Sequence, residues 1–99
     1  MSEQTVAEVL TAATDSVTVI NDINTNGNKS SHAGGQVDAS GNAVAGTWSQ
    51  AEINECVQRN VDHLELILEY PEPDVKNSSD DKSSYTSAIT TGKAYIAAN

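Results

Sequence analysis

The feature that most constrains the fold is an apolar stripe that begins after Ser49 and ends before Pro71 and Pro73. Glu52 follows Ser49 by three residues, which is the pattern of a capping box at the start of an α-helix. The next apolar residues are three or four positions apart and share one helical face. They are Ile53, Val57, Val61, Leu64 and Leu68. Because proline interrupts a helix, the pattern predicts a long central helix over residues 50 to 70.

Two further segments have helical periodicity. Apolar residues recur at helical spacing through residues 6 to 20, with Ser2 as the expected N-cap. Within that segment, residues 16 to 20 alternate and are rich in β-branched side chains, so both helix and strand remain open there. Near the C-terminus, Asp80 and Asp81 suit the start of a third helix. Its expected apolar face consists of Tyr85, Ala88, Ile89, Gly92, Tyr95 and Ile96.

Residues 24 to 46 separate the first two helices and are mostly Asn, Gly, Ser and Ala, without a helical period. Asp38 and Gly41 suit the first and fourth positions of a type I turn, which favours a small hairpin with a glycine bulge. An isolated hairpin is marginally stable in water, so we expect the segment to be mobile in the free chain and to dock on another chain. The expected interaction residues are Val37, Asp38, Gly41, Val44 and Trp48.

These patterns predict one mainly α domain over residues 1 to 99. It has about three helices, with a long polar loop or a small β-hairpin between the first and the second. Trp48, which precedes the cap of the central helix, is expected to fold over Ile53 or Cys56 as a hydrophobic staple. With one Trp, three Tyr and no Phe, the chain has few large residues for a core, so part of its stability is expected to come from partners.

The charge of the chain is strongly acidic, with five Lys and Arg against fourteen Asp and Glu. The excess is concentrated in residues 1 to 24 and 47 to 70. An acidic field repels phosphate backbones and anionic lipid headgroups, so the expected partners are other protein subunits rather than nucleic acid or a membrane. Cys56 is the single cysteine, and no signal-peptide or membrane-spanning pattern is found, so neither secretion nor membrane insertion is expected.

Residues 22 to 27 resemble the first half of a calcium-binding loop of the EF-hand type. Asp22, Asn24 and Asn26 would be side-chain ligands, Asn28 a carbonyl ligand and Ser30 a further contact, with Gly27 in the tight turn. The twelfth position, which should supply a bidentate carboxylate, is Ala33 instead, and Lys29 takes a position that is normally apolar. We therefore favour a helix terminus capped by Gly27, with Asn24 or Asn26 in a left-handed conformation, and expect no cofactor or metal.

No complete catalytic motif is present. Glu55, Arg59 and His63 lie four residues apart on one flank of the predicted central helix, which is typical of a solvated face with charge pairs. Cys56 is flanked by acids that oppose thiolate formation and is expected to be a buried or half-buried apolar residue. His32 lies at no metal-ligand spacing from another His or Cys. The sequence therefore indicates a non-enzymatic protein.

The acidic composition rich in Asn, Ser, Thr and Ala, the scarcity of aromatic residues and the turn from Val37 to Asn42 resemble small virion structural proteins of tailed bacteriophages. The resemblance implies a capsid-decorating, neck or tail component that docks through its helices and residues 24 to 46. It also implies a virion location, and without a phage origin the expected location is cytoplasmic. Two alternatives remain: an acidic regulator that imitates DNA, and a degenerate calcium-loop module.

Overall fold

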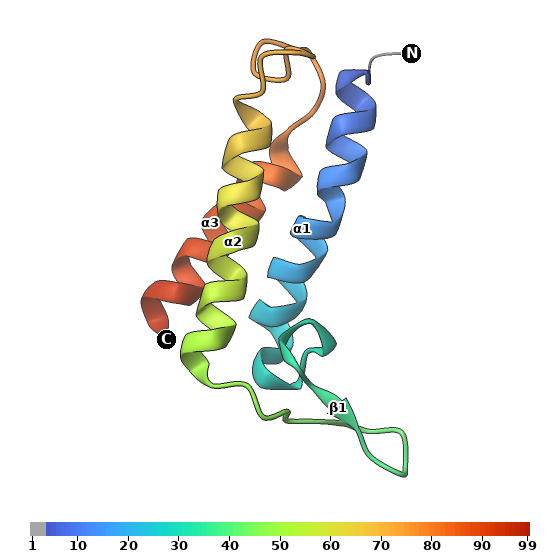
Figure 1. Cartoon of the computed structure of the whole chain (residues 1–99), viewed down its shortest axis with the longest axis vertical. Coiled ribbons are helices and arrows are strands. Elements are labelled where there is room, and N and C mark those ends of the chain that lie inside the picture. The colour runs from blue at the N-terminus through green and yellow to red at the C-terminus, as the bar shows by residue number, and fades with distance from the viewer. Residues whose placement is uncertain (1–3) are drawn as a thin grey trace.

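The computed structural model describes residues 4 to 99 and has three helices in one bundle (Figure 1). They are α1 (Val6–Asn26), α2 (Gln50–Leu68) and α3 (Ser83–Ala98). Between α1 and α2, the strands β1 (Gln36–Val37) and β2 (Ala43–Val44) form an antiparallel hairpin. The predicted class, a mainly α fold with three helices and a small hairpin between the first two, is confirmed.

Helix α1 begins with a capping box in which the Thr5 hydroxyl accepts from the Glu8 amide and the Glu8 carboxylate accepts from the Thr5 amide. The helix therefore starts at Val6, with Thr5 as its N-cap, and the predicted cap Ser2 lies outside the described residues. Residues 16 to 20 are helical because Ser16 and Ile20 are both buried on the face that packs against the other helices. This burial outweighs the β-branched character of the segment.

Helix α2 follows its prediction closely. Ser49 and Glu52 form the capping box, and the hydrogen bond from the Ser49 amide lowers the pKa of the Glu52 carboxyl below its usual value. The apolar stripe of the helix lies in the core. Its residues with at most 1% exposure are Ile53, Val57, Val61 and Leu64. The helix ends at Leu68, two residues before the predicted end, and the chain then turns so that Val75 also becomes fully buried.

Helix α3 closes the bundle through its small and aromatic residues. The Tyr85 hydroxyl donates to the Leu10 carbonyl oxygen at 2.8 Å, which connects the start of α3 to α1. The Asp81 carboxylate accepts from the Ser83 amide at 2.9 Å, as expected for an acid at a helix start. Gly92 is buried and lies so close to Val61 of α2 that a side chain would be hindered there. One core is thus shared by all three helices.

The segment between α1 and α2 is more ordered than the sequence suggests. Residues 24 to 26 belong to α1, and residues 27 to 33 fold into two short 3-10 turns, η1 (Gly27–Lys29) and η2 (Ser31–Ala33). Ala33 is fully buried, and Ser30 is 2% exposed. The first part of residues 24 to 46 therefore packs on the bundle of its own chain, whereas we expected the segment to dock on another chain.

Candidate functional site

The β1–β2 hairpin projects from the end of the bundle where α1 stops and α2 starts (Figure 1). Gln36 pairs with Val44, and Val37 pairs with Ala43. The turn closes through a hydrogen bond from the Gly41 amide to the Asp38 carbonyl oxygen at 3.0 Å. Gly41 has a φ of 85°, a conformation that glycine adopts without strain. The predicted turn over Asp38 to Gly41 is therefore present.

The Asp38 side chain fixes the tip of the hairpin. One carboxylate oxygen accepts from the amides of Ser40 and Asn42, each at 2.9 Å. The Asp38 amide in turn donates to the Asn42 carbonyl oxygen at 2.9 Å. These bonds satisfy the backbone of the turn from within the hairpin, so the tip keeps its shape without support from the helices.

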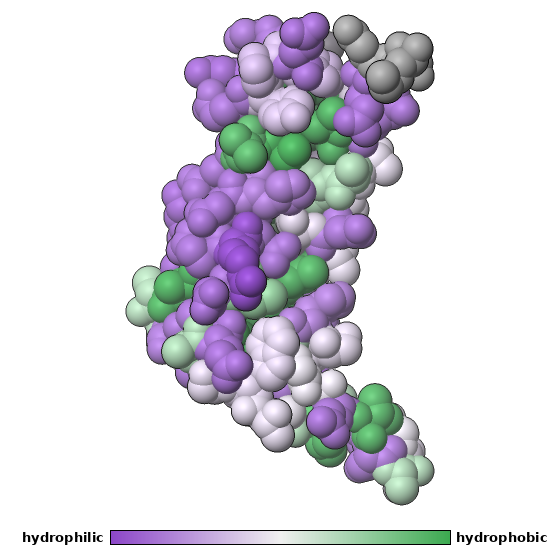
Figure 2. Space-filling view, viewed as in Figure 1, coloured by the Kyte–Doolittle hydropathy of each residue, from purple (hydrophilic) through white to green (hydrophobic). Residues whose placement is uncertain are grey.

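The side chains of the hairpin are largely exposed. Val37 is 69% exposed and Val44 is half-buried, and the residues of the turn are exposed. Figure 2 shows apolar colour on the projecting hairpin, apart from the body of the bundle. Two-stranded hairpins gain little stability alone, so a molecule that covered Val37 would add burial that the hairpin lacks.

The base of the hairpin is anchored by close backbone contacts. The Gly46 amide donates to the Asn28 carbonyl oxygen at 3.0 Å, and a side chain on Gly46 would collide with the carbonyl oxygen of Gly34. The indole of Trp48, predicted to fold over Ile53 or Cys56, lies against Gly34. Trp48 thus helps to hold the base, whereas Val37 at the far end remains free of the bundle. Gly34 and Gly46 flank the hairpin, and they were assigned no role from the sequence.

A second cluster surrounds Asp22 in the last turn of α1. Its carboxylate accepts from the Asn26 amide group at 2.7 Å, the Ser30 hydroxyl at 2.5 Å and the His32 ring at 3.0 Å. The Ser30 hydroxyl lowers the pKa of the Asp22 carboxyl most, followed by His32. The cluster therefore ties η1 and η2 to the end of α1.

This arrangement differs from a calcium loop. Asp22, Asn24 and Asn26 lie in α1 rather than in a loop, and Asn28 accepts from Gly46 through its carbonyl oxygen. Gly27 is the C-cap of α1 with a φ of 57°, whereas no residue other than glycine has a positive φ among residues 4 to 99. The predicted glycine cap is confirmed, and the left-handed asparagine is wrong. The described residues contain no group of three or more His, Cys, Asp or Glu arranged to hold a metal ion.

We expect Asp22→Asn to destabilise the protein near neutral pH and to have little effect in acid. The pKa of Asp22 is lowered in the folded chain, so its stabilisation is complete above the unfolded pKa of about 3.8 and is lost as the pH falls through the lower folded value. Thermal unfolding at about pH 6 and about pH 2 measures this, and the difference between Asp22→Asn and the original chain should shrink as the pH falls. Asp15→Asn, at an exposed position of the same helix, serves as the control. An equal loss at both pH values would contradict the role of the Asp22 charge.

The residues considered for catalysis are dispersed. His63 is exposed, and its Nδ1 lies 2.9 Å from the hydroxyl of buried Ser16, a cross-helix contact that the sequence did not predict. Arg59 pairs with Glu55 at 3.8 Å on the solvated flank, as expected. Cys56 is half-buried, as predicted, and lies 3.8 Å from the His32 carbonyl oxygen. His63 also lines a hollow between α1 and α2, and Arg59 and Cys56 do not line that hollow.

A scan of family models finds no match to this chain, and neither curated proteins nor solved structures include a similar one. Within residues 4 to 99, no helix combines the length and the apolar character that crossing a membrane requires. The candidate functional site is the hairpin with its base at Gly34 and Gly46, and this assignment rests on the contacts and exposure described above.

Proposed function

We propose that this chain is a non-enzymatic structural component of a larger protein assembly and docks through its β1–β2 hairpin. The observation that supports the proposal most strongly is the combination of an anchored base with an exposed tip. The base is fixed by the Gly46 contacts, while Val37 is 69% exposed at the other end. A partner surface that covers Val37 would supply the burial that the hairpin lacks in its own chain.

The chemistry of the hairpin defines the kind of contact. Its two strands are paired only with each other, so their outer edges offer backbone amides and carbonyls to a further strand. Val37 offers an apolar side chain for a pocket, and Asp38 keeps the turn in one shape. The partner is a protein subunit, either another copy of this chain or a different protein.

The assembly that we propose is the particle of a tailed bacteriophage. This proposal is supported by the acidic composition rich in Asn, Ser, Thr and Ala and by the turn from Val37 to Asn42. A small helical body that presents a hairpin suits a capsid-decorating, neck or tail position. In each position a small subunit has to attach to a larger protein surface.

The second candidate is an acidic regulator that binds a nucleic-acid-binding protein. It is supported by α1, which carries Glu8, Asp15 and Asp22 and has no Lys or Arg. A regulator of this kind would use the charged helices, whereas the assembly component depends on the hairpin. Removal of the hairpin therefore distinguishes the two candidate functions, because only the assembly component depends on it.

We expect deletion of residues 36 to 45 to leave the helices folded and to abolish incorporation into the assembly. The deletion joins Gly35 to Gly46, which are neighbours at the base of the hairpin, so the anchor needs little rearrangement. Circular dichroism and thermal unfolding measure the fold, and co-sedimentation with the particle from the source cells measures incorporation. Val37→Ser should weaken incorporation in the same direction. Normal incorporation of the deletion variant would overturn the proposal.

A further inference from the structure

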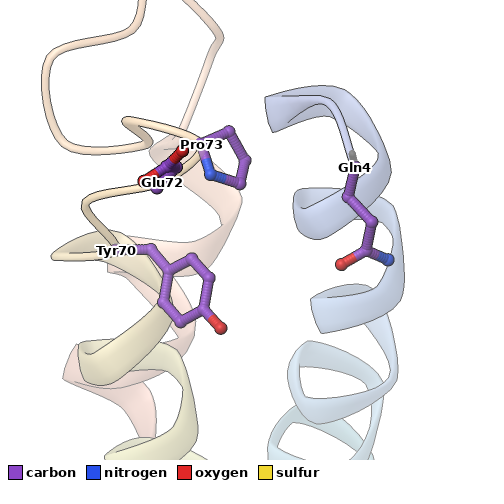
Figure 3. Close-up of a pocket in the computed structure, with 4 residues that line it drawn as sticks. All are labelled: Gln4, Tyr70, Glu72 and Pro73. Carbon is purple, nitrogen blue, oxygen red and sulfur yellow. The ribbon is translucent and has the colours of Figure 1, made fainter. Parts of the chain in front are cut away.

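A groove runs between α1 and α2 at the end of the bundle opposite the hairpin. It begins in a hollow of about 340 Å³ lined by Gln4, Tyr70, Glu72 and Pro73. Figure 3 shows the Tyr70 ring and Pro73 on one side of this hollow and Gln4 on the other. A second hollow, of about 90 Å³, shares Gln4 and Tyr70 with the first and extends along both helices. We call the two together the α1–α2 groove.

The floor of the smaller hollow of the α1–α2 groove is mainly apolar. It is formed by Val9, Ala12 and Ala13 from α1 and by Ile67 from α2, with His63 at its inner end. The two alanines are short and leave room above them, since longer side chains would fill the hollow. The groove follows α2 from His63 to the end of the helix at Leu68 and continues to Tyr70, a stretch comparable to about two helical turns, or roughly 10 Å. This length suits a contact with two turns of a further helix.

The α2 edge of the groove is also apolar. Tyr70, which follows the end of α2, lines both hollows and is 38% exposed, while Leu66 of α2 is 62% exposed and precedes the lining residue Ile67 in the sequence. Figure 2 shows a band of apolar residues across this end of the molecule, below the α2–α3 connection. An apolar hollow with Tyr70 in its lining and the exposed Leu66 on the same stretch of chain forms a patch of the kind that protein partners cover.

The α1 edge of the groove is acidic instead. Glu8 and Asp15 are four residues before and three residues after Ala12, so they lie on the same flank of the helix. Glu72 adds a carboxylate at the open end. The four ion pairs among residues 4 to 99 include none of these acids. Arg59, one turn before His63 on α2, pairs with Glu55.

The contrast between the two edges defines the occupant. We propose that the α1–α2 groove binds an amphipathic helix of a partner protein whose apolar face covers Leu66 and Tyr70. Lys or Arg residues on one edge of that helix face Glu8 and Asp15. A second copy of this chain fits poorly, because it would bring its own acidic edge and a net charge of −9. The groove is a separate surface from the hairpin, so this inference goes beyond the proposed function.

The test uses a synthetic helical peptide of about 18 residues, or five turns, with Leu at helical spacing and Lys along one edge. Fluorescence anisotropy measures its binding to the full chain. A scrambled peptide of the same composition is the control for charge alone. We expect the helical peptide to bind at least about tenfold more tightly than the scrambled one, and its affinity to fall as salt screens the charges.

Variants locate the binding surface. Leu66→Ser and Asp15→Asn change exposed positions, so the fold should remain intact while peptide affinity falls, by about tenfold for Leu66→Ser. Val37→Ser removes an equally exposed apolar residue from the hairpin and should leave peptide affinity unchanged. The hairpin deletion should also bind the peptide normally, so failure of the proposed function and failure of this inference are distinguishable.

Three results would overturn the inference. Equal binding of the scrambled peptide would reduce the effect to non-specific charge attraction. Unchanged affinity in Leu66→Ser would place the peptide elsewhere. A dimer of this chain that competes with the peptide and is lost in Leu66→Ser would identify a second copy as the occupant.

Discussion

We expect Leu64→Ala to lower the free energy of unfolding by about 2 to 5 kcal/mol. Leu64 is fully buried and lies in the α2 stripe that contacts the core shared by all three helices. Truncation to alanine removes apolar surface from the core and leaves a cavity that the bundle fills only in part. Urea unfolding followed by circular dichroism measures the loss.

Leu66 provides the matched control for Leu64. It lies on the same helix two residues later and is 62% exposed, so Leu66→Ala should change the free energy of unfolding by less than about 0.5 kcal/mol. The two variants delete the same atoms from the same element and differ in burial. Equal losses of unfolding free energy in Leu64→Ala and Leu66→Ala would show that the face of α2 assigned to the core is wrong.

We expect Gly92→Leu to destabilise the protein by about 3 kcal/mol or more. A Cβ at position 92 would lie 2.5 Å from Val61 Cγ2 and 3.4 Å from Ile20 Cγ2, so a leucine there forces α3 away from both other helices. Val61 and Ile20 are buried and stiff, and neither side chain can move aside easily. The gain of about 1 kcal/mol in helix propensity is smaller than this cost. Thermal and urea unfolding measure the net effect.

Ala94→Leu is the control for Gly92→Leu. Ala94 is exposed on the same helix, so a leucine at that position meets solvent and should leave stability nearly unchanged. Native stability in Gly92→Leu would contradict the close approach of α3 to α2. A large loss of stability in Ala94→Leu would contradict the orientation of α3 that leaves Ala94 exposed.

Local sequence signals predicted α2 well. The capping box at Ser49 and the stripe that includes Leu64 are both encoded within a single helix, and the structure confirms them. The hairpin was also predictable, because Asp38 and Gly41 are the residues that the turn requires. The capping box of Thr5 and Glu8 has the same spacing as that of Ser49 and was missed in favour of Ser2.

Contacts through space account for what the sequence did not predict. Whether residues 16 to 20 are helical depends on the burial of Ile20 against other helices, which local propensity does not contain. The anchor of the hairpin depends on Gly46 meeting Gly34 and Asn28 across the loop. The glycines on either side of the hairpin were a usable signal, since close backbone approach requires a residue without a side chain.

The most direct test of the proposed docking is hydrogen exchange at the hairpin, measured in the free chain and in the assembly isolated from the source. We expect the amides at the outer edges of the hairpin to exchange rapidly in the free chain and to become protected in the assembly. The amides of α2 should be protected in the free chain and in the assembly. Hairpin exchange that is equally fast in both samples, or a chain that stays a 10.4 kDa monomer in its source, would contradict the account.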